Sequence, residues 1–197
     1  MLSVDSDWET FLESGPTQNS HTNIEKNDTF IPKCSDIYIS TQTKIAFLNQ
    51  NINLSDLFWK IPVTPYHTPT ECVIKKQMKV NSTTEEEVDM VEKLTRDTPG
   101  IVIIDTIAKI NNPNARKVKF KDVRKINIGL CKKDLVSYRT KKKGAFYNCF
   151  VLILRIKNKH AFKEAHVKVF NTGKLEIPGI QDTLFLYKVL DKLVSIM

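Results

Sequence analysis

Glycine is scarce in this chain of 197 residues, which contains only six glycines. Loops that cradle nucleotide phosphates depend on glycine, and neither a P-loop nor a G-x-G-x-x-G pattern is present. No apolar run approaches the roughly 18 residues that a transmembrane helix needs. The first residues also lack the positively charged stretch of a secretion signal. We therefore expect a protein that neither spans a membrane nor is secreted.

Metal-binding and catalytic patterns are missing as well. The four cysteines stand far apart without any C-x-x-C pair: Cys34, Cys72, Cys131 and Cys149. This spacing excludes a zinc finger and indicates reduced thiols in an intracellular protein. The four histidines are scattered, and neither a Ser/His/Asp order nor H-E-x-x-H is found. The sequence therefore predicts no enzyme, no metal site and no cofactor.

Positive charge is abundant and unevenly distributed. The 30 Lys and Arg residues against 22 Asp and Glu give a net charge of +8, which favours a polyanionic partner. Residues 1–30 carry −5, so residues 31–197 carry +13. We interpret residues 1–33 as an acidic, flexible tail. Such a tail is either a solubilising leader or a segment that competes with nucleic acid for the basic remainder of the chain.

Hydrophobic patterns predict an α+β fold. Apolar alternation or continuous apolar runs predict strands at 34–48, 72–78, 123–130, 147–156, 166–170 and 175–177. Helices are predicted at 53–60, within 81–98 and from 181 onward, the second of them acidic. The apolar segment 101–110 fits either a helix or a strand. A similar order of elements in the two halves suggests two copies of a unit of about 80 residues.

The predicted strand 166–170 places an aromatic residue beside a cation. Side chains alternate along a strand, so Val167 and Val169 point to one face while Lys168 and Phe170 point to the other. A surface of this kind suits the minor groove of DNA, where aromatic wedges separate base steps and lysines neutralise phosphates. The alternative is that Phe170 packs under the acidic helix or a loop of the first half.

The residues that follow carry a resemblance to a known family. Phe170-Asn-Thr-Gly-Lys174, followed by Ile177-Pro-Gly179 and a helix, resembles the strand–turn–strand of the TATA-box-binding protein family. Val151-Leu-Ile-Leu-Arg-Ile156 is similar to the apolar strand that precedes it in that family. In the first half, Lys60-Ile-Pro62 and Tyr66 resemble the family's helix end and connector.

The resemblance covers about residues 36–79 and 120–197. Overall the sequence resembles the divergent TATA-binding-like proteins of large DNA viruses. It implies a curved antiparallel sheet, or saddle, of two repeats with helices on the convex face. The chain would then comprise the tail 1–33, a first lobe 34–115 with an acidic helical insert, and a second lobe 116–197. The implied function is that of a transcription initiation factor that binds the minor groove through the concave face.

The resemblance also implies partners and a location. Double-stranded DNA, a transcription factor B-like protein and RNA polymerase would be the partners, with no membrane involved. The protein would act in the host nucleus or a cytoplasmic viral factory, or be packaged in the virion. We expect a monomer.

Individual residues match the family's DNA contacts. Phe170 corresponds to one of the inserted phenylalanines, and its strand partner falls at Cys149 or at Phe150. Asn127 stands where the first strand of a repeat offers a polar side chain to base edges. The remaining predicted contacts are with phosphates or come from the hairpin turn: Lys168, Lys174, Arg124, Lys125 and Thr172. Lysines 141–143 either contact phosphates as well or form a solvated loop.

The first half departs from the family pattern. Glu71-Cys72 has no aromatic residue, and 80–115 has no Gly-Lys hairpin. A second hypothesis therefore stays open, in which the protein is an interaction module of a viral transcription or virion complex with little specific DNA binding. RNA binding, with Phe150 and Phe170 stacking on bases, is a third.

Overall fold

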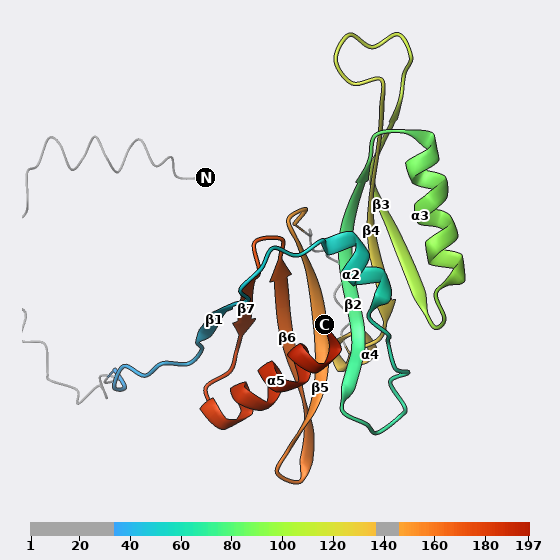
Figure 1. Ribbon diagram of the computed structural model, residues 1–197. Coiled ribbons are helices and arrows are strands. Elements are labelled where there is room, and N and C mark those ends of the chain that lie inside the picture. The colour runs from blue at the N-terminus through green and yellow to red at the C-terminus, as the bar shows by residue number, and fades with distance from the viewer. Residues whose placement is uncertain (1–33, 137–145) are drawn as a thin grey trace, which may run out of the picture. The chain divides into compact units, whose positions relative to one another are not determined.

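An antiparallel sheet forms the centre of the fold (Figure 1). The structure, a computed structural model, describes residues 34–136 and 146–197, and the predicted tail 1–33 and lysines 141–143 lie outside them. Within the described residues the sheet has seven strands in the order β1-β7-β6-β5-β2-β4-β3, and all neighbours are antiparallel. Their bounds are β1 (Thr43–Phe47), β2 (Cys72–Ser82), β3 (Val102–Asn111), β4 (Phe120–Gly129), β5 (Cys149–Asn158), β6 (Ala161–Phe170) and β7 (Lys174–Pro178).

Four helices accompany the sheet in the same part of the chain: α2 (Leu54–Lys60), α3 (Glu85–Asp97), α4 (Lys132–Val136) and α5 (Thr183–Ile196). The three longer helices begin after a polar residue whose side chain accepts a hydrogen bond from a backbone N–H of the first turn: Asn53, Thr84 and Asp182. A cap of this kind stabilises a helix by about 1 kcal/mol. The helices predicted at 53–60, within 81–98 and after 181 are confirmed.

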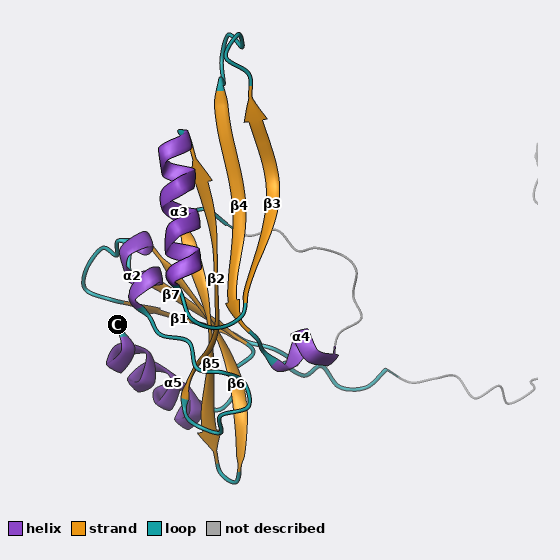
Figure 2. Ribbon diagram, turned by 90° about the vertical axis from the view of Figure 1, so that its right-hand side faces the viewer, coloured by secondary structure: helices purple, strands orange, loops and turns teal. Residues whose placement is uncertain are grey.

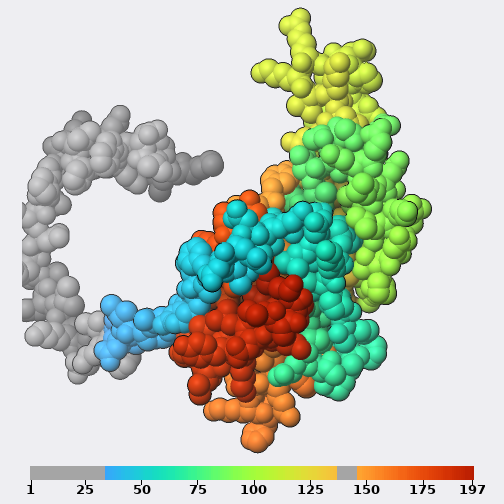
Figure 3. All heavy atoms as spheres, in the orientation of Figure 1, coloured from blue at the N-terminus to red at the C-terminus, as the bar shows by residue number. Residues whose placement is uncertain are grey.

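The two faces of the sheet carry different helices. α2, α3 and α5 lie on one side, which we call the helix face, and α4 lies on the other side, the open face (Figure 2). Figure 3 looks onto the helix face, where α5 (red) and α2 (cyan) cover part of the strands. The expectation that the helices share one face therefore holds for the three longer helices and is wrong for α4.

The main hydrophobic core lies between the helix face and the helices that cover it. Alternate residues of the central strands are buried there: Met78, Ile126, Ile128, Phe150, Leu152, Leu154, Val167 and Val169. Phe58 of α2 and three residues of α5, Phe185, Val189 and Leu193, close the core. Full burial of one such side chain contributes about 1.5–3 kcal/mol, so the core holds the helices against the sheet.

β5 is buried on both faces, as its continuous apolar sequence predicts. Ile153 points to the open face, yet it is almost fully buried in a second, small cluster with Ile74 and Cys131. Cys131 immediately precedes α4. The segment around α4 therefore supplies the cover that an apolar residue on the open face of β5 requires.

A buried lysine joins β2 to α2. Lys76 is 1% exposed, and its ammonium group donates hydrogen bonds to the carbonyl oxygens of Phe58 (2.7 Å) and Ile61 (2.6 Å). Carbonyl groups at the end of a helix have no partner inside it, so Lys76 satisfies groups that would otherwise be left unpaired. Burial lowers the pKa of Lys76 to about 8.

A buried arginine holds the proline-rich connector between α2 and β2. The Arg155 guanidinium, on β5, donates to the carbonyl oxygens of Tyr66 (2.6 Å), Thr68 and Thr70 (3.2 Å). The five donors of a guanidinium suit several carbonyls at once. Arg155 belongs to the segment that resembles the TATA-binding family, and its observed contacts are within the chain.

The structure decides one ambiguous segment and shortens one predicted strand. The ambiguous segment 101–110 is strand β3, whereas the strand predicted over 34–48 is confined to β1. The predicted lobe boundary at 115/116 falls in the turn between β3 and β4, which pair with each other.

None of the helices in the described ranges combines the length and apolar character needed to cross a membrane.

Candidate nucleic-acid interface

Phe170 lies at the end of β6 with its side chain on the open face. The register places Phe170 directly opposite Cys149 of β5, while the neighbouring Val169 points into the core. The alternation predicted for this strand is confirmed. The Phe170 ring is half-buried, and the Lys174 ammonium lies 5.4 Å from its centre. An aromatic ring and a cation therefore stand side by side on this face.

Phe150 points the opposite way. It lies opposite Val169, is fully buried, and its ring centre is 6.0 Å from that of Phe58 in α2. The prediction of Phe150 as a nucleic-acid contact is wrong, because a ring packed under a helix cannot reach a ligand on the open face. Cys149, which does point to that face, is the strand partner of Phe170.

Arg124 also belongs to the helix face. Its guanidinium pairs with Asp122 of the same strand and with Glu92 of α3, both at 2.8 Å. The hydrogen bonds that Arg124 donates to Asp122 are the main reason why the pKa of Arg124 is raised above its usual value. The prediction of a phosphate contact by Arg124 is wrong, because the side chain holds α3 on the sheet and points away from the open face.

Lys168 and Lys174 lie on the open face and share one carboxylate. Glu176 of β7 accepts from Lys174 at 2.8 Å and from Lys168 at 3.2 Å. These bonds, that from Lys174 foremost, lower the pKa of Glu176. These pairs are partly buried but still reached by solvent, and ion pairs at a surface contribute only about 0–1 kcal/mol. Both lysines can therefore exchange the carboxylate for a phosphate at little cost.

Asn127 and Lys125 lie on the open face of β4, two strands away from β5. Asn127 is almost fully buried, and its amide donates to the Ile103 carbonyl oxygen of β3 at 3.4 Å. Its amide is therefore engaged within the sheet, and contact with base edges stays a prediction. Lys125 is partly buried between its register partners Lys79 and Asp105. A phosphate contact by Lys125 stays a prediction.

The turn that follows Phe170 presents Thr172 to solvent beside the aromatic residue. Gly173 closes the turn with a hydrogen bond from its N–H to the Phe170 carbonyl oxygen at 3.0 Å, and its φ is +78°. A Cβ at this position would stand 2.5 Å from the Gln50 carbonyl oxygen. Glycine is therefore required here both for its φ and for the close approach of the segment after β1.

Three aromatic residues that the sequence did not single out join Phe170 on the open face. The Lys79 ammonium lies 3.8 Å from the ring centre of Tyr147, and the Lys168 ammonium lies 5.7 Å from that of Phe146. Phe47, on β1, stands opposite Lys174 in the register. Phe47, Phe146 and Tyr147 are 70%, 65% and 52% exposed. We call Phe47, Phe146, Tyr147, Phe170, Lys79, Lys168 and Lys174 together the aromatic–lysine patch.

One signal for the missed residues was present in the sequence. Lys75, Gln77 and Lys79 alternate along β2 with the buried Lys76 and Met78. Assigning faces to this strand would have placed Lys79 on the open side. Tyr147 and Phe146 could not be found in this way, because they precede β5 and their position depends on how the chain enters the sheet.

The other end of the open face is covered. Asp134 of α4 accepts from the Lys75 ammonium at 2.7 Å, and the N–H of Lys132 donates to Glu164 of β6 at 2.8 Å. His166 lies beneath this cover, and burial lowers its pKa. The area open to a ligand is therefore the end that carries the aromatic–lysine patch.

Ionisable groups elsewhere do not assemble a reactive centre in the ranges that the structure describes. No three or more His, Cys, Asp or Glu side chains are grouped there so as to hold a metal ion. Cys131 is buried, and this burial raises the pKa of its thiol, as it does for Cys149. Raised values keep both thiols protonated and unreactive at neutral pH.

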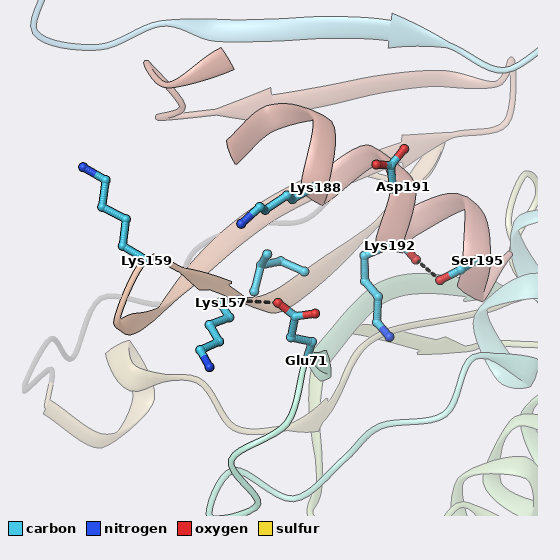
Figure 4. A pocket seen from close by; sticks show the side chains of 8 residues that line it. Glu71, Lys157, Lys159, Lys188, Asp191, Lys192 and Ser195 are labelled. Atoms are coloured by element: carbon cyan, nitrogen blue, oxygen red, sulfur yellow. Dashed lines mark hydrogen bonds between the residues drawn. The ribbon is translucent and has the colours of Figure 1, made fainter. Parts of the chain in front are cut away.

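A separate hollow of about 550 Å³ lies where the β5–β6 hairpin meets α5 (Figure 4). It is lined by Glu71, Ile156, Lys157, Lys159, Lys188, Asp191, Lys192 and Ser195. The Lys157 N–H donates to the Glu71 carboxylate at 2.7 Å. The four lysine side chains point in different directions rather than toward one place. No residue of the aromatic–lysine patch lines this hollow.

The structure thus brings some predicted residues together and separates others. Phe170, Lys168 and Lys174 lie in one patch bordered by Thr172, whereas Phe150 and Arg124 point to the opposite face. No family model, no curated protein and no solved structure matches this chain.

Proposed function

We propose that this protein binds double-stranded DNA through the aromatic–lysine patch and acts as a TATA-binding-like transcription initiation factor. The observation that carries the proposal is the set of three lysine–aromatic contacts on the uncovered end of the open face: Lys79 with Tyr147, Lys168 with Phe146, and Lys174 with Phe170. Large exposed apolar groups on a soluble protein mark binding surfaces. Cations interleaved with them favour a ligand that is both flat and polyanionic.

The chemistry of the patch fits the minor groove. Sugars and base edges there meet apolar side chains, and a ring such as that of Phe170 can enter between base steps while lysines contact the flanking phosphates. Strand edges and backbone groups play no part in such a contact. The side chains of the patch come from four strands and the segment before β5, so the contact surface is broad rather than linear.

The fold supports a two-repeat saddle in one respect. The order strand–helix–strand recurs as β1-α2-β2 and as β4-α4-β5, and β2 and β5 are neighbours at the middle of the sheet. In this proposal the lobes 34–115 and 116–197 are divergent copies of one unit. A transcription factor B-like protein and RNA polymerase would be recruited to the complex with DNA.

A second candidate is a protein-interaction module, favoured by two observations. Glu176 stands between two lysines of the patch, and α4 covers the other end of the face. A carboxylate within the patch opposes phosphates and suits a partner that offers both charges. In this case DNA binding would be weak, independent of sequence and strongly dependent on salt.

Fluorescence anisotropy with a labelled DNA duplex at several salt concentrations tests the proposal, together with energy transfer between the duplex ends to measure bending. We expect Phe170→Ala to weaken binding and to reduce bending. Lys188→Ala, on α5, is the matched control, because Lys188 is exposed but lies away from the patch. If Phe170→Ala and Lys188→Ala bind and bend the duplex equally well, the patch is not the DNA site.

A further inference from the structure

The outer edge of β3 is long and apolar, and nothing pairs with it within the described residues. β3 is ten residues long, ends the sheet and pairs only with β4. Five isoleucines on or beside it are between 39% and 53% exposed: Ile101, Ile103, Ile104, Ile107 and Ile110. No helix crosses β3 in Figure 2, which looks toward this side of the molecule. The strand thus offers apolar side chains together with a free backbone edge.

An edge of this kind is a template for another strand. Its outward N–H and C=O groups are unpaired, and soluble proteins usually shorten such strands or protect them with charges. The opposite edge strand, β1, has only five residues, half the length of β3. β3 carries one acid and one base, Asp105 and Lys109, so the strand is neutral in a chain of net charge +8. Two copies of β3 can therefore meet without the electrostatic repulsion that two positively charged strands would have.

A bulge decides how β3 can pair with itself. The register with β4 shifts between Thr106 and Ala108, so Ile107 is the extra residue. Before the bulge Ile103 lies opposite Asn127, and after it Ile110 lies opposite Lys121. Asn127 and Lys121 are six residues apart on β4 and therefore share a face. Ile103 and Ile110 consequently share the open face. In a strand without a bulge, two residues seven positions apart would lie on opposite faces.

Opposite residues in an antiparallel ladder must point to the same face. A register that spans the bulge must therefore pair an odd-numbered residue with an even-numbered one, as Ile103 before the bulge with Ile110 after it. The register centred on the strand places the two-fold axis between Thr106 and Ile107. It brings Ile103 of each copy opposite Ile110 of the other, twice in one interface.

We propose that β3 is a self-association site, at which a second copy of this chain adds its own β3 antiparallel and continues the sheet. The contact is isologous, so it closes as a dimer and does not propagate. A bulge usually hinders the pairing of an edge strand with another strand. Here a second β3 carries the same bulge, so its side chains match those of the first in the centred register. This proposal replaces the expectation of a monomer. It is independent of DNA binding, because no residue of the aromatic–lysine patch lies on β3.

Sedimentation of the full chain without DNA tests this proposal. We expect a dimer at roughly 100 µM that dissociates on dilution. Ile110→Lys should raise the dissociation constant at least about tenfold, because two ammonium groups would be buried per interface. Ile45→Lys, which changes an exposed isoleucine on the opposite edge strand β1, should have no effect. A monomer at every concentration, or a dimer that only Ile45→Lys disrupts, would overturn the proposal.

A cross-link tests the register and does not depend on the affinity variant. Cβ atoms of directly opposite residues are about 4.5–5.5 Å apart, close enough for a disulfide after a small adjustment. The combined substitutions Ile103→Cys and Ile110→Cys, in a chain with the exposed Cys34→Ser, should give a covalent dimer under mild oxidation. Thr106→Cys with Ile110→Cys, whose side chains would not be opposite one another, should not. Equal cross-linking of the two variants would contradict the register.

Discussion

The ammonium nitrogen of Lys79 lies 3.8 Å from the ring centre of Tyr147, although the two residues are far apart in the sequence. The contact joins β2 to the segment that leads into β5. It places a cation over an aromatic face at the uncovered end of the open face, so it is the most direct sign of a ligand surface in the described residues.

We expect Tyr147→Ala to weaken binding of a DNA duplex by about five- to tenfold, or about 1 kcal/mol, because the ring supplies a flat apolar contact. Tyr147→Phe keeps the ring and should retain most of the affinity. Anisotropy titrations at one fixed salt concentration measure the difference. Equal affinities of the Ala and Phe variants would exclude a contact through the ring.

The two phenylalanines at the end of the β5–β6 pair should behave in opposite ways. Phe150→Ala should lower the free energy of unfolding by about 3–5 kcal/mol, because it opens a cavity under α2. Phe170→Ala, on the open face, should cost far less stability. Urea denaturation measures both. A larger loss of stability for Phe170→Ala would contradict the placement of Phe150 in the core.

The charged residues assigned to phosphate contacts separate into two groups. Lys174→Gln should flatten the dependence of log affinity on log salt by up to about one unit. Arg124→Gln should leave this slope unchanged but lower stability by about 3 kcal/mol, because the buried Asp122 loses its partner. Salt titrations and denaturation distinguish the two effects. A flatter salt slope for Arg124→Gln would place that side chain at the DNA after all.

Lys76 should make stability depend on alkaline pH. Its pKa is lowered to about 8 in the folded protein and is about 10.4 in the unfolded chain, so the unfolded state binds more protons between these values. Stability should therefore rise from pH 8 to pH 10 relative to Lys76→Met, by about 2 kcal/mol. Below pH 8 the two stability curves should run parallel. Curves that stay parallel up to pH 10 would mean that the buried ammonium is not destabilised.

Gly173 can be compared with a matched glycine. Gly173→Ala should cost at least about 2 kcal/mol, because the left-handed φ is strained and the new Cβ meets the Gln50 and Leu48 carbonyl oxygens. Gly179 has nearly the same φ, +80°, but nothing within 4 Å of a Cβ. Gly179→Ala should therefore cost only about 1–2 kcal/mol. Thermal unfolding measures the difference, and equal losses would show that the segment after β1 yields to the methyl group.

Local patterns predicted most of the secondary structure. Asn53 and Thr84 cap helices that lie within the predicted ranges 53–60 and 81–98, and Val169 points away from Phe170. Caps and alternation depend on a few neighbouring residues, so a local pattern records them. The alternation that buries Ile126 also places Arg124 on the same face, so the position of Arg124 was present in the sequence but was not used.

Tertiary features were harder to predict. The choice between Cys149 and Phe150 as the partner of Phe170 depends on where β5 begins relative to β6, a one-residue shift that turns every side chain to the other face. The side of the sheet on which α4 lies, and hence the cover over His166, follows from contacts between distant segments such as Lys75 with Asp134. No local pattern records such contacts.

The position of α4 makes the two ends of the open face different, which matters for the orientation of a bound duplex. A face that is alike at both ends accepts a duplex equally well in either of two orientations. Here one end carries aromatic rings and the other is closed by a helix tied down through Asp134. The two ways of laying a duplex on this face are therefore not equivalent, and a protein that bound a promoter in this way would itself distinguish upstream from downstream.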